Sequence, residues 1–154
     1  MLIALACDHA GYPLKKLLHS WLEKKGHQVL NLGVDTDAVP ADYPDYARAV
    51  AEAVAAGKAE RGIVVCGSGV GACVAANKVP GARACMCHDT FSARQGVEDD
   101  DLNILCLGGR VIGSELAYEI VRVWLNARFT GAERHLRRKN KVLAIESANY
   151  SKEA

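Results

Sequence analysis

The chain has the length, composition and charge of one ordinary globular domain. Its 154 residues are near the commonest domain size, and 50% of them are hydrophobic and 24% charged, which excludes a disordered or fibrous chain. The formal net charge of +1 provides no general attraction to nucleic acid or membrane, so neither is expected as a partner. We therefore expect a single domain over 1–154.

The first residues and the cysteines indicate a cytoplasmic protein. MLIALAC is apolar, but it lacks a basic region and runs directly into Asp8 and His9, so it is neither a signal peptide nor a membrane span. The six cysteines include no CxxC pair, so reduced thiols are favoured over disulfides. Cys85 and Cys87 flank Met86 and would face one side of a strand, which suggests core packing rather than metal binding.

Apolar runs alternate with helical patterns along the whole chain. In order we expect strand 2–7, helix 12–26, strand 28–33, helix 42–57, strand 62–66, a helix after Gly69, strand 82–87, a helix after Asp89, strand 103–108 and a helix from 114 to about 128. Strands that are apolar throughout are typical of a parallel sheet covered on both faces. The pattern predicts a three-layer, Rossmann-like (flavodoxin-like) α/β sandwich with a five-stranded parallel sheet.

Polar residues follow four of the predicted strands. In α/β folds ligands bind beyond the carboxyl ends of the strands, at the point where the strand order reverses. The residues that this rule brings to one crevice are Asp8, His9, Cys66, Ser68, His88, Asp89 and Arg110.

The segment VVCGSGVGACVAANK, at 64–78, places Gly67, Gly69 and Gly71 at alternate positions. It lacks the lysine of a P-loop and has not the spacing of the dinucleotide fingerprint, so a nucleotide is not favoured. A glycine turn that opens a helix offers backbone N–H groups to a phosphate or an oxyanion, although it could also be only a tight turn. Cys66, which precedes it, could act as a thiolate base or nucleophile, or be a buried structural cysteine.

A basic cluster, ERHLRRKNK, lies near the end of the chain. If it is helical, Arg134 and Arg138 share one face, and two arginines in this arrangement can hold a phosphate. A solvated basic face without a ligand is the alternative.

Five motifs in the same order resemble one known family. They are CDHAG, DYPDYA, VCGSGVGACVAANKVPGARA, LGGRVIG and ERHLRRKNK. Together they are similar to the type B ribose-5-phosphate isomerases, in the family that includes the galactose-6-phosphate isomerase subunits. The resemblance extends over roughly 2–146.

The resemblance implies an aldose–ketose isomerase that acts on a sugar phosphate without a metal or organic cofactor. In the family a base moves a proton between C2 and C1 through a cis-enediolate. Some members use the cysteine before the glycine turn, and others have serine there and a glutamate later in the loop. Because this chain has Cys66, and Ala72 at the glutamate position, it resembles the cysteine type.

The resemblance also assigns roles to individual residues. Cys66 is the expected base, and Ser68 with the turn amides is expected to stabilise the enediolate. Asp8 would hold hydroxyl groups and His9 would reach the phosphate. The full set of expected substrate-binding residues is Asp8, His9, Gly67, Gly69, Val70, Gly71, Asp100, Arg110, Arg134 and Arg138.

A homodimer with sites at the subunit interface is implied as well. One subunit would supply residues to the other's site, with 131–154 as a C-terminal helical arm that forms the dimer. The apolar side chains Val142, Leu143 and Ile145 on this arm would pack either on the chain's own core or on the partner. Whether two dimers associate further stays open.

One departure concerns ring opening. The family usually has a histidine before the fifth strand, which protonates the ring oxygen of the furanose, whereas here Asp99 stands at that position and Asp100 replaces a common asparagine. A carboxylic acid with an ordinary pKa near ~3.9 is a poor donor at neutral pH, unless burial and the acidic neighbours Glu98, Asp100 and Asp101 favour its protonated form. Either Asp99 is such an acid, or a weaker substitute, and acts on ribose 5-phosphate, or the substrate is acyclic, as a tetrose 4-phosphate is.

Three other functions are open to a chain with these residues. The chain could isomerise a hexose 6-phosphate, or bind a sugar phosphate without turnover. A thiol redox sensor built on Cys66 and Cys73 is the third, although their separation across the turn disfavours a disulfide.

Overall fold

The computed structural model describes residues 1–150, so the last four residues of the predicted arm lie outside the described part. Strands and helices alternate from the first residue onward, as predicted. The elements are β1 (Leu2–Cys7), α1 (Tyr12–Lys24), β2 (Gln28–Asn31), α2 (Tyr43–Ala55), β3 (Arg61–Cys66), α3 (Val70–Ala76), β4 (Ala84–Met86), α4 (Thr90–Asp100), β5 (Ile104–Gly108), α5 (Ser114–Asn126) and α6 (Glu133–Tyr150).

The five strands form one parallel sheet in the order β2-β1-β3-β5-β4. The Rossmann-like α/β class is therefore confirmed, with one detail of its own: a flavodoxin-like sheet runs 2-1-3-4-5, and here the last two strands are exchanged. The order reverses between β1 and β3, where Cys7 pairs with Val65. At this switch point the connections that follow β1 and β3 lead to opposite faces of the sheet, and a crevice for a ligand is left beyond the strand ends.

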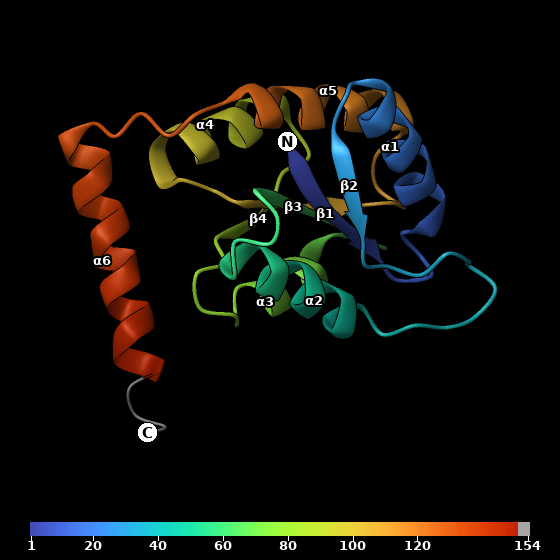
Figure 1. Ribbon diagram of the computed structural model, residues 1–154, viewed down its shortest axis with the longest axis horizontal. Coiled ribbons are helices and arrows are strands. Elements are labelled where there is room, and N and C mark those ends of the chain that lie inside the picture. Colours follow the sequence, from blue (N-terminus) through green and yellow to red (C-terminus); the bar gives the residue numbers. More distant parts are fainter. Residues whose placement is uncertain (151–154) are drawn as a thin grey trace.

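Helices cover both faces of the sheet (Figure 1). On one face α1, α4 and α5 bury a cluster of large side chains that includes the fully buried Trp124. On the other face α2 and α3 pack through small residues such as Ala47, Ala51 and Ala72. Because alanine side chains are small, α3 packs closely against the sheet on this second face. The glycine turn immediately precedes α3.

Element boundaries differ from the prediction by a few residues. Gly26 and Gly57 have positive φ angles of 82° and 69° and follow the ends of α1 and α2, as expected of glycines past a helix end. The strand expected at 82–87 is shorter, because the Asn103 side chain accepts from the Arg83 amide at 2.7 Å and the Asn77 side chain from the Ala84 amide at 2.9 Å. These side chains take the places of strand partners at the start of β4.

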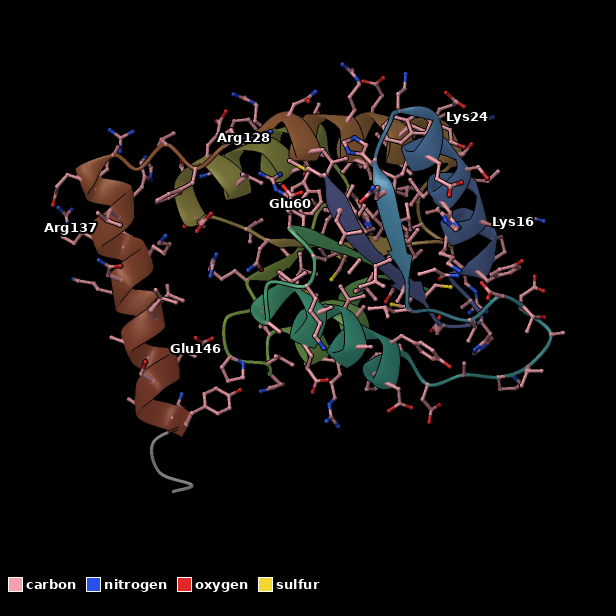
Figure 2. All side chains as sticks on the ribbon, in the orientation of Figure 1. Lys16, Lys24, Glu60, Arg128, Arg137 and Glu146 are labelled. Atoms are coloured by element: carbon pink, nitrogen blue, oxygen red, sulfur yellow. The ribbon has the colours of Figure 1, made fainter. Side chains whose placement is uncertain are left out.

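Helix α6 extends along one side of the domain as an arm (Figure 1), which confirms the predicted C-terminal helix. Figure 2 shows Glu146 on the side of α6 that faces the domain, where its carboxylate accepts from the Gly81 amide at 3.2 Å. Val142 and Ile145 are 55% and 65% exposed. No helix within residues 1–150 is long and apolar enough to cross a membrane.

Candidate active site

A cleft of about 460 Å³ opens at the carboxyl edge of the sheet, beside the switch point between β1 and β3. Its lining comes from three strand ends and from the start of α2. The lining residues are Asp8, His9, Ala10, Tyr43, Cys66, Gly67, Ser68, Gly71, Arg110 and Val111. Five of these ten, Asp8, His9, Cys66, Ser68 and Arg110, were brought to one crevice by the carboxyl-end rule, and Gly67 and Gly71 were expected from the family resemblance.

Cys66 is the last residue of β3 and borders the cleft with only 3% of its surface exposed. Two backbone amides hold it. The Gly69 amide donates to the Cys66 sulfur at 3.1 Å, and the Gly109 amide donates to the Cys66 carbonyl oxygen at 2.8 Å. The sulfur is therefore held by the glycine turn itself.

Two glycines of the turn are required sterically. Gly69 has a φ of 82°, and a Cβ there would lie 3.0 Å from the carbonyl carbon of Leu107, so a side chain is excluded by conformation and by space. A Cβ on Gly71 would lie 2.6 Å from the Tyr43 ring. Within the turn the exposed Ser68 hydroxyl accepts from the Val70 amide at 3.2 Å. Gly69 and Val70 support the turn and do not line the cleft.

Asp8 and His9 enter the cleft from the end of β1. Asp8 is 6% exposed, and its Oδ1 accepts from the Gly11 amide at 2.9 Å, which leaves Oδ2 for a ligand. His9 Nδ1 lies 3.1 Å from both the carbonyl oxygen and the amide nitrogen of Ala41. Since Ala41 fixes one ring nitrogen, the other, Nε2, is available to the cleft.

Arg110 supplies positive charge to the cleft from the end of β5. Its amide donates to the Gly67 carbonyl oxygen at 3.0 Å, and its side chain lies beside Gly67. The guanidinium is exposed and makes no ion pair within the described part of the chain. An unpaired arginine beside a carboxylate and a thiol suits a phosphorylated, hydroxylated ligand.

His88 and Asp89 were expected in the same crevice, and this was wrong. They follow β4, which lies at the sheet edge beyond β5, two strands from the switch point. His88 Nε2 accepts from the Gly108 amide at 2.9 Å, and burial lowers the pKa of His88. Asp89 caps α4 by accepting from the Ser92 amide at 2.7 Å. Both have structural partners.

Four expected site residues lie at the opposite edge of the sheet. Asp99 and Asp100 end α4, which starts beyond the carboxyl end of β4 and runs back to the amino end, where the Asp101 carboxylate pairs with Arg83 at 2.9 Å. Arg134 and Arg138 are exposed on α6. Within one subunit, these four residues are not brought to the cleft.

Asp99 has two neighbours of its own. Its Oδ2 accepts from the Gln95 amide group at 2.7 Å, and its Oδ1 lies 3.4 Å from Nε2 of His135. Two of its acidic neighbours are paired elsewhere, Glu98 with Arg94 and Asp101 with Arg83 and Lys139. Because Glu98 and Asp101 are already paired with cations, they do not support the expectation that acidic neighbours favour the protonated form of Asp99.

Tyr43 is the residue that sequence reasoning missed. The motif DYPDYA contains it, but nothing in the motif alone shows that the first residue of α2 reaches the glycine turn across the cleft. Within residues 1–150 no cluster of three His, Cys, Asp or Glu side chains could hold a metal ion.

The six cysteines are free thiols, as predicted. Cys73 lies on α3 with its sulfur 3.5 Å from the Ala84 carbonyl oxygen, on the side of β4 and not of the cleft, which disfavours a sensor that joins Cys66 to Cys73. A hydrogen bond with the Cys106 thiol lowers the pKa of Cys73 to about 6, against the effect of burial.

Comparisons with known proteins identify the family of the chain. A family model described as ribose/galactose isomerase matches residues 3–142. Ribose-5-phosphate isomerase B of Escherichia coli is 43% identical over 94% of this chain and 95% of its own, and D-erythrulose-4-phosphate isomerase of Pectobacterium atrosepticum is 43% identical over 84% and 85%. The solved ribose-5-phosphate isomerase B of Clostridium thermocellum is 46% identical, with a TM-score of 0.94 over 97% of this chain and 99% of that one. The chain therefore belongs to the ribose/galactose isomerase family of sugar phosphate isomerases.

Proposed function

We propose that the protein interconverts ribose 5-phosphate and ribulose 5-phosphate through a cis-enediolate, with Cys66 as the base. The position of the Cys66 sulfur carries the proposal: the Gly69 amide holds it at 3.1 Å in a cleft that also contains Asp8 and Arg110. Proton transfer between C2 and C1 needs a base at the floor of such a cleft. The name of the E. coli relative supports the pentose phosphate as substrate.

The other cleft residues have roles that follow from their chemistry. Amides of the turn from Gly67 to Gly71, with Ser68, stabilise the negative charge that develops on the enediolate oxygens. Asp8 accepts hydroxyl groups through its free oxygen, and His9 reaches the phosphate through Nε2. Arg110 binds the phosphate as a charge-assisted donor. No step of this scheme calls for a metal or an organic cofactor.

The complete site, in our proposal, takes residues from two subunits of a homodimer. Cys66 and Asp8 lie at the carboxyl edge of the sheet, whereas Asp99, Asp100, Arg134 and Arg138 lie at the amino edge. A second copy that brings its α4 end and α6 to the cleft would supply the four missing groups. The exposed Val142 and Ile145 on α6 support this arrangement, because a second copy would bury them. Association of two dimers is left open.

A tetrose 4-phosphate is the second candidate substrate. It cannot close a furanose ring, because the oxygen required carries the phosphate, so its isomerisation needs no ring-opening acid. Asp99 stands at the position where the family usually has the ring-opening histidine, and a tetrose 4-phosphate makes no use of that group. The Pectobacterium relative is named for such a substrate.

Isomerisation assays with ribose 5-phosphate, erythrose 4-phosphate and galactose 6-phosphate test the proposal, with Cys66→Ala as the control. Turnover of ribose 5-phosphate that is lost in Cys66→Ala supports it. Turnover of only the tetrose or the hexose phosphate would mean that this compound, and not ribose 5-phosphate, is the substrate. Binding without proton exchange at C2 would indicate a binding protein. If ring opening limits the rate, Asp99→His should increase the rate of isomerisation of ribose 5-phosphate and leave the rate with erythrose 4-phosphate unchanged.

A further inference from the structure

His135 lies buried between the first turn of α6 and the end of α4, where two charged side chains approach the same ring nitrogen. Arg134 donates from Nε to His135 Nε2 at 3.0 Å, and Oδ1 of Asp99 lies 3.4 Å from that nitrogen. The residue is 4% exposed, so water hardly competes for these contacts. Its other nitrogen, Nδ1, is buried and has no hydrogen-bond partner within residues 1–150.

Nε2 of His135 cannot serve both neighbours at once. To accept from Arg134 it must present its lone pair, and the ring hydrogen of the neutral imidazole then lies on Nδ1. To bond with the Asp99 carboxylate it must carry a hydrogen itself. An imidazolium carries hydrogens on both nitrogens, so it can only donate to Asp99, and it repels the guanidinium.

The contact with His135 leaves the outer end of Arg134 free. Because Nε is engaged, both terminal Nη groups remain for an external anion, and the exposed side chain makes no ion pair within the described residues. An arginine held through Nε has lost part of its rotamer freedom before the ligand arrives. Binding of a phosphate then costs less conformational entropy of the Arg134 side chain.

We propose that His135 is a positioning residue that holds Arg134 ready for the substrate phosphate when the imidazole is neutral, and releases it to pair with Asp99 when the imidazole is protonated. This rests on the proposed function, in which Arg134 binds the phosphate. In this chain Asp99 thereby sets when the phosphate site is formed, in addition to any contact with the sugar.

The surroundings of His135 contain few other charges that could produce the same effect. From α6 it faces Arg134, and from α4 it faces Asp99, whose second oxygen is held by the neutral Gln95. Along α6 the charges nearest in sequence are Glu133 and Arg137, which pair with each other at 2.8 Å, and then the exposed Arg138. Lys139 pairs with Asp101 at 3.1 Å, so the charges of both pairs offset each other. The protonation state of His135 therefore decides which of its two charged neighbours it holds.

The expected signature is a rise in KM on acidification that exceeds any change in kcat. Acidification favours the imidazolium form of a histidine, so lowering the pH from about 7.5 to about 5.5 should release Arg134. Loss of one charge-assisted contact to phosphate should raise KM by up to about tenfold. Because the phosphate is bound equally in the ground and transition states, kcat should change less.

The experiment measures kcat and KM at both pH values for the sugar phosphate that the protein turns over best, in wild type, His135→Gln and Asp99→Asn. The glutamine oxygen can accept from Arg134 but does not titrate, so His135→Gln should keep its KM near the wild-type value at neutral pH and lose the acid effect. Titration of the substrate phosphate affects both proteins and cancels in their ratio. In Asp99→Asn the rise in KM on acidification should occur at lower pH, because a carboxylate no longer stabilises the imidazolium form of His135.

An equal rise in KM on acidification in wild type and His135→Gln would overturn the proposal. A change on acidification in kcat alone would overturn it as well. If His135→Gln does not fold, an unchanged midpoint in Asp99→Asn is the overturning result. If no sugar phosphate is turned over, the proposed function fails instead. Calorimetric titration of wild type and His135→Gln with inorganic phosphate at both pH values then tests the positioning role by itself. The Kd of the wild type for phosphate should rise on acidification by up to about tenfold, and that of His135→Gln should rise less.

Discussion

The ring of Tyr43 lies so close over Gly71 that a Cβ on the glycine would stand 2.6 Å from the ring. Tyr43 begins α2 and Gly71 lies in the first turn of α3. The contact therefore joins two helices at the rim of the cleft, and the glycine sets the position of the aromatic wall.

Gly71→Ala should displace the Tyr43 ring and widen or block the cleft. A misplacement of about 1 Å in a site can cost up to about 100-fold in rate, so we expect kcat/KM to fall at least tenfold while the protein stays folded. Gly113→Ala is the matched control, because a Cβ at Gly113 has no atom within 4 Å. Equal activity of the two variants would mean that the ring position has no effect on catalysis.

Two inactive variants should restore each other's activity if the site is shared between subunits. Cys66→Ala removes the proposed base, and the double variant Arg134→Ala/Arg138→Ala removes groups that the partner would supply. A mixed dimer then contains one intact site, so co-expression in equal amounts should give about a quarter of the wild-type rate. Separately tagged subunits allow the mixed dimer to be purified. Sites built within one subunit would leave every mixed dimer inactive, and a monomeric mass by light scattering would contradict the dimer itself.

Cys73 should react with alkylating reagents at lower pH than an ordinary thiol. Its hydrogen bond with Cys106 lowers the pKa of Cys73 to about 6, while the pKa of Cys106 is raised well above its usual range. The rate of iodoacetamide modification at Cys73, followed by mass spectrometry, should be half-maximal near pH 6 and level above pH 7. Free cysteine titrates near ~8.5. In Cys106→Ala the midpoint should move upward, and an unchanged midpoint would refute the assigned cause.

The free energy of unfolding should decrease as the pH falls below about 6.5, partly through His88. Burial lowers the pKa of His88, so on acidification the unfolded chain binds a proton that the folded chain does not. His27, whose pKa burial also lowers, acts in the same direction. Urea unfolding at about pH 7.5 and about pH 5 should show a smaller pH effect in His88→Gln than in wild type. His19→Gln, at a partly exposed position, should keep the full effect.

The strands were predictable because of their surroundings. A parallel strand covered on both faces must be apolar at nearly every position, and this holds for β1, β3 and β5, whose residues are almost all buried. Strand order was not predictable, since it depends on pairings between residues far apart in sequence. The misplacement of His88 and Asp89 follows from this: nothing in their own segment shows that β5 separates β4 from β3.

The site was predictable to the extent that strand ends position it. Asp8 and Arg110 follow strands and Cys66 ends one, and the sheet brings the three together. Tyr43 is brought in by the packing of α2 against α3, and His135 meets Asp99 only because α6 folds back against α4. Contacts between helices leave no short-range signal in the sequence, so these two pairs required the structure.

The glycine turn has a consequence for how this family could diversify. Its hydrogen-bond donors are main-chain amides, such as that of Gly69, and no side-chain replacement other than proline deletes an amide. A lineage can therefore change the side chains around the cleft and keep the amide that holds the Cys66 sulfur. New substrates are then reached by altering what other elements contribute, as with Tyr43 on α2 or Asp99 on α4, while the reaction type is inherited unchanged.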